Sequence, residues 1–362
     1  MTLDATIDET ATTAIGGNRI VGAVMLVSHR GQLVYQKAHG LADREAGREM
    51  AIDAIFRLSS VTKPIVSATI LAMVDQGLLR LDDSIDRFFP EFRPRLPDGS
   101  SPRILISQLL THTSGLAAGP LPWADGAEAV LGAIEGRPML FAPGTAWSYG
   151  PSIDVLGAIA AKLVDGRPED ALRRFVLDPL GMSDTRFSVT DPTRLAVPYG
   201  DSAEGPARMG DTHTVIAPWG GEVKYDPPRI FNSNVFQSGG GGMAGSARDI
   251  MTFLEAVRTG GGGVLRPETA RLGLESQTPQ LAQAGEPGWG FSYFGACLTD
   301  KTKTEHKGAV GTNRWGGIYG HHWVVDPVNE LTIVSMSNTG LEGSDGRYRY
   351  ETTDAVYRAL GL

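Results

Sequence analysis

The sequence predicts an α+β fold, in which an antiparallel sheet is flanked by helices and interrupted by an inserted helical lobe. Strand-like runs rich in β-branched residues stand near both ends of the chain, at 21–27, 32–38, 290–297, 314–325 and 331–337. Short helical pieces punctuated by proline and glycine fill the middle. Because strands from both ends can share one sheet, we expect residues 1–79 and 240–362 to form a sheet domain and residues 80–239 to form a mostly helical inserted domain.

The N-terminal elements follow from local patterns. Residues 5–17 predict a short helix that ends at two glycines. The two strands that come next are separated by residues 29–31 (His-Arg-Gly), which predicts a hairpin. An apolar-periodic segment then runs from 58 to 77 and predicts a helix whose first turn is distorted by Pro64.

The middle of the chain combines short helices with one long irregular segment. Residues 108–113, 151–164 and 168–176 have helical spacing. Residues 196–240 are rich in glycine, proline and asparagine and predict a long loop region, of the kind that often forms the rim of a binding site. Three tryptophans of this part are candidates for either the pocket lining or the core: Trp123, Trp147 and Trp219.

The C-terminal part returns to strands and helices. Ser246 and Asp249 form a capping box that predicts a helix through Val257. A turn at 326–329 precedes the last strand, and residues 350–360 predict a final helix.

The composition argues against several kinds of partner. The 362 residues include 33 basic and 41 acidic ones, and no run of lysine or arginine occurs, so nucleic acid and anionic membranes are poor candidates. No apolar run approaches membrane-spanning length, and the polar, acidic first 17 residues do not resemble a secretory signal. The single cysteine, Cys297, excludes an internal disulfide. We therefore expect a cytoplasmic protein.

The chemistry is expected at the start of the helix that follows Leu58. Ser60 and Lys63 are three positions apart, so a helix sets both side chains on one face, one turn apart. A nucleophile then lies beside a possible proton acceptor. The helix N-terminus adds unpaired backbone N–H groups, which favour an oxyanion that forms at Ser60. A Ser-x-x-Lys pair also occurs as a helix cap followed by a solvated lysine, so the pair alone does not establish a catalytic site.

Two further segments supply the parts that such a pair needs. Tyr149 stands at a turn before a predicted helix, where its hydroxyl could meet the lysine and relay a proton. A strand farther on carries the run Trp315, Gly316, Gly317 and Ile318. Its two glycines let a ligand lie against the backbone and meet an edge N–H group. Taken alone, the tyrosine also fits an ordinary loop residue, and the glycines also fit a bulge.

Together these elements resemble the serine β-lactamase and penicillin-binding-protein superfamily, in particular its branch of class C β-lactamases and family VIII carboxylesterases. Residues 60–63 (Ser-Val-Thr-Lys) match its Ser-x-x-Lys motif, and Tyr149 stands where the family has the tyrosine of Tyr-x-Asn. Segments 109–116, 179–185 and 241–249 match internal signatures of the family in the same order. The resemblance spans nearly the whole chain and implies a β-lactamase-like fold.

Two departures from the family concern the substrate. Where β-lactamases carry Lys-Thr-Gly, this chain has Trp315, Gly316 and Gly317, so the cation that holds a substrate carboxylate is missing and a neutral substrate is favoured. Pro151 replaces the asparagine of Tyr-x-Asn and offers no side-chain amide for an acylamide group. Both departures are similar to family VIII esterases. In an alternative alignment, residues 306–308 (His-Lys-Gly) take the place of Lys-Thr-Gly.

The resemblance implies a serine carboxylesterase for small, neutral, short-chain esters. Ser60 would attack the ester carbonyl, while Lys63 and Tyr149 accept and relay its proton. The N–H groups of Ser60 and Ile318 would stabilise the oxyanion, with the substrate lying against residues 315–317. We expect no cofactor and no metal. A small-molecule ester is the expected partner, and the oligomeric state is left open.

Other functions remain open at this point. A β-lactamase, a D-alanyl carboxypeptidase or an acyltransferase of the same fold is the first alternative, and a non-catalytic scaffold is the second. The chain has no Gly-x-Ser-x-Gly elbow, which argues against an α/β-hydrolase. His321 and His322 are adjacent and would point to opposite faces of a strand, which argues against a metal site.

Overall fold

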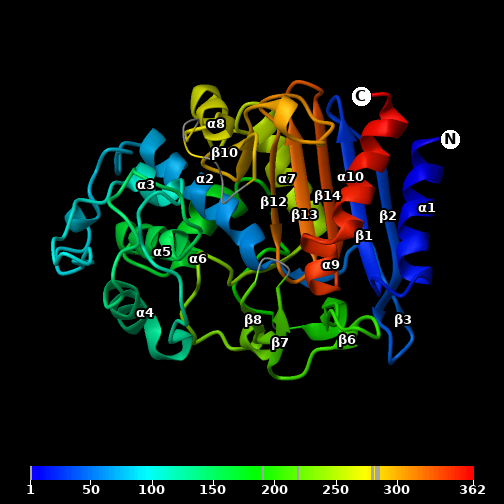
Figure 1. Ribbon diagram of the computed structural model, residues 1–362, viewed down its shortest axis with the longest axis horizontal. Coiled ribbons are helices and arrows are strands. Elements are labelled where there is room, and N and C mark those ends of the chain that lie inside the picture. Colours follow the sequence, from blue (N-terminus) through cyan, green and yellow to red (C-terminus); the bar gives the residue numbers. More distant parts are fainter. Residues whose placement is uncertain (1, 190, 218–219, 279–280, 282–285) are drawn as a thin grey trace.

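An antiparallel sheet of eight strands forms one side of the molecule, and helices α2 to α6 gather beside it (Figure 1). The computed structural model describes residues 2–189, 191–217, 220–278, 281 and 286–362. The strands are β1 (Gly22–His29), β2 (Gln32–Asp43), β3 (Arg48–Glu49), β4 (Ile55–Arg57), β5 (Tyr199–Gly200), β6 (Ala207–Arg208), β7 (His213–Ile216), β8 (Glu222–Tyr225), β9 (Ala244–Ser246), β10 (Trp289–Phe291), β11 (Ala296–Leu298), β12 (Asn313–Gly317), β13 (His321–Asp326) and β14 (Leu331–Ser337). The helices are α1 (Leu3–Gly16), α2 (Thr62–Asp75), α3 (Ile106–Leu110), α4 (Gly126–Glu135), α5 (Ser152–Leu163), α6 (Pro168–Leu172), α7 (Ala247–Arg258), α8 (Pro267–Leu274), α9 (Gly340–Ser344) and α10 (Arg347–Leu360).

The two ends of the chain meet in the sheet. Its strand order is β10-β11-β12-β13-β14-β1-β2-β3, so the first strand lies beside the last, with Ala23 opposite Ser337. Helices α1 and α10 lie side by side against the sheet, and both termini are at the same end of the molecule (Figure 1). The hairpin between β1 and β2 turns at Arg30 and Gly31, both with positive φ, as expected for a two-residue hairpin loop.

Both faces of the sheet are covered, which explains why β1 is buried along nearly its whole length. Met25 and Val27 pack with residues of α1 and α10 in one cluster. Val24 and Leu26 point the other way, into the large core that also holds α2 and α7. A strand covered on both sides is apolar at consecutive positions rather than at every second one.

Helix α2 runs through the middle of this large core. All of its residues from Thr62 to Met73 are buried, and α5, α6 and α8 pack against it. The turn before it, Ser59–Val61, is a 3-10 helix. This turn is the distortion expected at the start of the helix, because Pro64 lies within the first turn of α2 and has no N–H group. The segment with the Ser-x-x-Lys motif is therefore held in a packed interior.

The predicted elements agree with the structure at most positions and differ at a few. The first hairpin, α5, α7 with its Ser246 cap and the strand β14 are confirmed. The single strands predicted at 290–297 and 314–325 are wrong, because each is a hairpin: β10–β11 and β12–β13. In the second, Ile318 lies in the turn, and Gly320 supports the reversal with a φ of +119°. Helices α4 and α8 were not predicted.

The segment 196–240 is also more ordered than predicted. It contains two small ribbons, β5–β6 and β7–β8, and a 3-10 helix at Pro227–Phe231. Every strand of the large sheet comes from residues 22–49 or 289–337. The division into a sheet domain and a mostly helical inserted domain stays a prediction, since α2 and α5 share one core with the sheet. Of the helices that the structure describes, none has both the length and the hydrophobicity needed to cross a bilayer.

Candidate active site

Ser60 and Lys63 are in direct contact at the start of α2. Lys63 Nζ donates to Ser60 Oγ at 3.0 Å and also donates to the carbonyl oxygen of Gly240. Lys63 is only 8% exposed. Within the described part of the chain, no carboxylate forms a salt bridge with this amine, and its two hydrogen-bond partners are a hydroxyl and a carbonyl oxygen. A proton can therefore move between the amine and Ser60 without first breaking a salt bridge.

Tyr149 completes a group of three side chains. Its hydroxyl donates to Ser60 Oγ at 2.7 Å, and Lys63 Nζ lies 4.5 Å from the centre of its ring. Tyr149 stands before α5, whereas the other two residues stand at the start of α2, and α2 and α5 pack together. The structure thus brings together three residues that are far apart in the sequence.

Aromatic rings surround Tyr149 and fix its position. The ring centroids of His112 and Trp315 lie 4.7 and 5.3 Å from that of Tyr149, and Trp147 lies behind it at 6.4 Å. His112 is fully buried, and burial together with the nearby positive charge of Lys63 holds its pKa well below the usual range. It is therefore neutral, and its Nδ1 accepts a hydrogen bond from the N–H group of Gly150. His112 therefore packs against Tyr149 as a neutral side chain.

Ser59 is a feature of the site that the sequence did not indicate. Its φ of 41° lies in the left-handed region, which is uncommon for a residue other than glycine, asparagine or aspartate. Its hydroxyl is buried and has no hydrogen-bond partner among the described residues. A backbone held in this region costs of order 1–3 kcal/mol, and such strained residues are typical of functional sites.

Strand β12 runs close to the turn that carries Ser60. A Cβ atom added to Gly317 would lie 2.3 Å from the carbonyl oxygen of Leu58 and 2.6 Å from Ser59 Oγ, so only glycine permits this approach. Ile318 follows directly, and its carbonyl oxygen accepts a hydrogen bond from the hydroxyl of Tyr225 at 3.0 Å. Among the described residues, neither the N–H group of Ser60 nor that of Ile318 donates a backbone hydrogen bond. Both remain available to a ligand.

The other residues proposed from the sequence lie near this point. Ile318 lines the cavity in front of Ser60, whereas Trp315, Gly316 and Gly317 lie beside that cavity. Gly316 sits beside Gly317 on β12, and Trp315 packs against Tyr149. The alternative segment 306–308 packs against α10 instead, with the rings of His306 and Tyr357 5.8 Å apart. His321 and His322 do point to opposite faces: the first contacts the carbonyl of Arg57 and the second that of Gly343. The described residues include no cluster of three or more metal-binding side chains.

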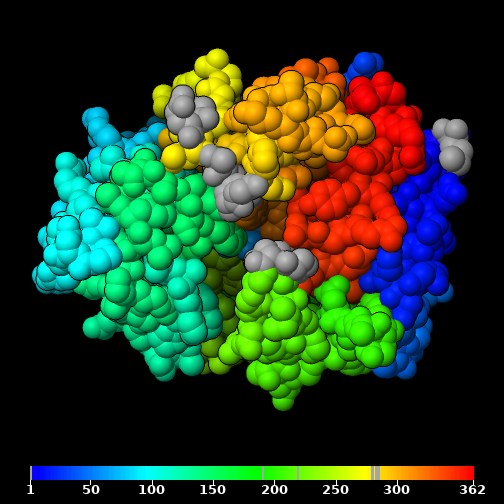
Figure 2. Space-filling model, viewed as in Figure 1, coloured from blue at the N-terminus to red at the C-terminus, as the bar shows by residue number. Residues whose placement is uncertain are grey.

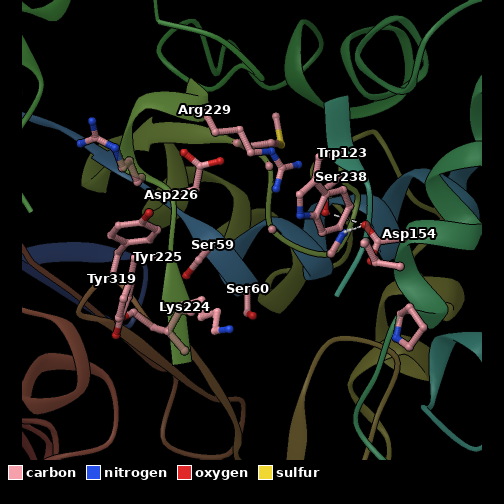
Figure 3. A pocket seen from close by; sticks show the side chains of 18 of the residues that line it. Ser59, Ser60, Trp123, Asp154, Lys224, Tyr225, Asp226, Arg229, Ser238 and Tyr319 are labelled. Carbon is pink, nitrogen blue, oxygen red and sulfur yellow. Dashed lines mark hydrogen bonds between the residues drawn. The ribbon is translucent and has the colours of Figure 1, made fainter. Parts of the chain in front are cut away.

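A cavity of about 440 Å³ opens in front of Ser60. In Figure 3, Ser59 and Ser60 lie at its centre, with Tyr225 and Tyr319 on one side and Trp123, Ser238 and Asp154 on the other. The surface is hollowed between the helices and the sheet (Figure 2). Trp123 thus lines the pocket and Trp147 packs behind Tyr149, while Trp219 lies outside the described residues.

The expectation of a cavity without a fixed cation is wrong. Arg57 and Arg229 both line it, as do Lys224, Asp154 and Asp226. The lysine of Lys-Thr-Gly is absent from the sequence, but a missing motif does not exclude cations that come from other segments. Of these charged residues, Asp154 alone had a signal that sequence reasoning could have used, because it is the one acidic residue in the apolar helix α5.

Comparison with known proteins identifies the family. The Beta-lactamase family matches residues 4–357. Esterase EstB of Burkholderia gladioli is 41% identical over 375 aligned residues, which cover 98% of this chain and 94% of that protein. The solved structure of EstCE1, a hydrolase with promiscuous acyltransferase activity, has a TM-score of 0.93 at 35% identity and covers 98% of both chains. Unliganded simvastatin synthase LovD from Aspergillus terreus shares the fold, with a TM-score of 0.76 at 20% identity over 99% of both chains. The chain therefore belongs to the Beta-lactamase family.

Proposed function

We propose that this protein is a serine carboxylesterase that hydrolyses small, neutral, short-chain esters through an acyl-enzyme at Ser60. The observation that carries the proposal is the double contact of Ser60 Oγ, with Lys63 Nζ at 3.0 Å and Tyr149 Oη at 2.7 Å. The names of EstB and EstCE1, an esterase and a hydrolase, support the same class of reaction.

The reaction proceeds in two halves. Ser60 Oγ bonds to the ester carbonyl carbon as its proton passes to the Lys63 and Tyr149 pair, and the carbonyl oxygen becomes an oxyanion. The N–H groups of Ser60 and Ile318 stabilise that oxyanion. When the bond to the alcohol breaks, the departing oxygen takes up the proton. A water molecule then attacks the acyl-enzyme, gives its proton to the same pair, and Ser60 is released with a carboxylic acid as product.

The cavity supports a small and neutral substrate. Its volume of about 440 Å³ is within the range of sites for small molecules. Its wall carries both signs of charge, with Arg57 and Arg229 against Asp154 and Asp226, and Lys224 is paired with Glu222 at 3.4 Å. Pro151 and Trp315 stand where a β-lactamase has an amide and a lysine, so an amide substrate finds fewer partners.

Transfer of the acyl group to an alcohol is a second candidate, because EstCE1 is described as having promiscuous acyltransferase activity. An alcohol would replace water in the second half of the same reaction. The products differ: an ester of the added alcohol forms in place of the free acid.

Covalent labelling tests the main proposal. A fluorophosphonate probe should add one adduct to the protein at Ser60 in intact-mass and peptide analysis, and Ser60→Ala should stay unlabelled. Turnover of p-nitrophenyl butyrate should exceed that of nitrocefin. An unlabelled wild-type protein would identify a non-catalytic scaffold, and faster nitrocefin hydrolysis would identify a β-lactamase.

A further inference from the structure

Asp154 lines the cavity, and one of its two carboxylate oxygens binds no described residue. The residue stands in the first turn of α5 and is only 4% exposed. Its Oδ1 accepts two hydrogen bonds, from Ser238 Oγ at 2.5 Å and from the N–H group of Gly240 at 3.0 Å. Its Oδ2 accepts none within the described part of the chain. A buried carboxylate with a free oxygen on a cavity favours a ligand that donates a hydrogen bond.

Arg229 lies near this carboxylate but does not pair with it. Its guanidinium stacks on Trp123 at 4.1 Å from the ring centre, and Nη2 donates to the carbonyl oxygen of Phe236 at 3.2 Å. Burial lowers the pKa of Arg229, while the charges of Asp154 and Asp226 act in the opposite direction. No ion pair joins Arg229 to an acidic side chain among the described residues. A guanidinium has five N–H donors, so this one offers further donors to a ligand.

The two groups lie along the same cavity wall in Figure 3, with Trp123 and Ser238 close to both. From this we infer that the cavity contains a subsite for a neutral substrate group that both donates and accepts hydrogen bonds, namely a hydroxyl or a primary carboxamide. The group donates to Asp154 Oδ2 and accepts from Arg229. The inference rests on the proposed esterase function and narrows its substrate class. An ion of either sign fits less well, since a carboxylate meets Asp154 and an ammonium meets Arg229.

The subsite lies close to the reacting atoms. Gly240 contacts both Lys63 and Asp154: its carbonyl oxygen accepts a hydrogen bond from Lys63 Nζ, and its N–H group donates one to Asp154. The polar group therefore stands on a part of the substrate near the ester carbonyl. Two sets of esters distinguish the acyl side from the alcohol side.

The experiment compares a hydroxyl with a methoxy group, since an ether accepts hydrogen bonds but donates none. The acyl-side set is ethyl 3-hydroxybutyrate, ethyl 3-methoxybutyrate and ethyl pentanoate. The alcohol-side set is 2-hydroxyethyl, 2-methoxyethyl and propyl butyrate. In one of the two sets, kcat/KM of the wild-type enzyme should be roughly tenfold or more higher for the hydroxyl ester than for the methoxy ester, because the hydroxyl bonds to a charged acceptor.

Two variants separate substrate binding from a structural role of Asp154. In Asp154→Asn, the amide oxygen keeps the bonds from Ser238 and Gly240 and the NH₂ group faces the cavity, so the ether is accepted and the hydroxyl-to-methoxy ratio falls toward one. Arg229→Met keeps an apolar stem on Trp123 and lowers the hydroxyl-to-alkyl ratio. Arg80→Met, at an exposed position that does not line the cavity, is the matched control and should leave both ratios unchanged.

These ratios of kcat/KM test the subsite even if one variant folds poorly, because each ratio compares two substrates on the same protein preparation. A hydroxyl-to-methoxy ratio near one in both sets of the wild type would overturn the inference. So would ratios that neither Asp154→Asn nor Arg229→Met changes. If the wild type labels with fluorophosphonate and hydrolyses the alkyl esters, either result removes only this subsite. If it does neither, the proposed esterase function fails as well.

Discussion

Two parts of the cavity wall differ in how the chain builds them. The part that carries Ser60 and Tyr149, which we call the nucleophile wall, comes from the 3-10 turn that leads into α2, the segment before α5 and the turn after β12. Its supports are deeply buried, and α2 and α5 share the largest hydrophobic core. The other part, the β8 wall, consists of residues 224–230 and comes from a two-stranded ribbon and one 3-10 helix. Its neighbours Ile216 and Phe231 are 71% and 49% exposed.

The difference separates the reaction from the choice of substrate. Of the groups that contact Ser60 Oγ, Lys63 is buried and Tyr149 is half-buried among aromatic rings, and this packing holds their geometry and resists substitution. The β8 wall touches that interior through a few contacts, such as the bond from Tyr225 to Ile318. Substitutions there can reshape the pocket at a small cost in stability. The comparison predicts large losses of activity from the first wall and small ones from the second.

Replacing the amine tests the nucleophile wall most severely. Lys63→Met keeps the apolar stem but removes the proton acceptor next to Ser60, so kcat/KM for p-nitrophenyl butyrate should fall about 10³- to 10⁴-fold. Lys162→Met, on exposed α5 surface beside Phe89, is the matched control and should keep full activity. A loss of less than tenfold in Lys63→Met, with unchanged circular dichroism, would remove the lysine from the mechanism.

Gly317→Ala tests the contact between β12 and the nucleophile turn. The new methyl group would overlap the carbonyl oxygen of Leu58, so the strand must move and carry the N–H group of Ile318 with it. We expect kcat to fall about 100-fold, since an oxyanion donor displaced by a fraction of an ångström is largely lost. Gly132→Ala in α4, where an added Cβ meets nothing within 4 Å, should leave kcat unchanged. Equal kcat in the two variants would contradict this use of β12.

Tyr225→Phe tests whether the β8 wall assists the same oxyanion. The change removes the hydrogen bond to the Ile318 carbonyl and leaves the ring in place, so a roughly tenfold loss in kcat is expected. KM should change less, because the bond orients the enzyme rather than the substrate. Tyr350→Phe, at an exposed position of α10, serves as the control. An unchanged kcat would mean that the nucleophile wall needs no support from β8.

The same division explains which parts of the fold and the site the sequence predicted and which it did not. Local patterns predicted α2, α5, α7 and the first hairpin, because the buried face of a helix or strand requires apolar residues at a regular spacing. The Ser-x-x-Lys spacing and the family resemblance then predicted Ser60, Lys63 and Tyr149 as one site. Asp154 and Arg229 were not predicted, because each has its partners in distant segments of the chain and such pairs produce no periodic pattern. Asp154 differed from its surroundings only as the acidic residue of an apolar helix. The positive φ of Ser59 and the turn at Ile318 were not predicted for a similar reason. Tertiary contacts impose these backbone conformations on residues that have no strong preference for them.

The smallest expected effect concerns acid and His112. Its folded-state pKa is held well below its usual range by burial and by Lys63, so as pH falls the unfolded chain takes up a proton near pH 6.5 before the folded protein does. Protonation therefore favours unfolding, and the stability is lost as pH falls below about 6.5. His112→Gln has no such group but can still accept the bond from Gly150. Between pH 7.5 and 5.5, the wild-type free energy of unfolding in urea should drop about 1.4 kcal/mol more than that of the variant. Parallel pH profiles for the two proteins would mean that His112 is not kept neutral behind Tyr149, and the rigidity assigned to the nucleophile wall would lose one of its supports.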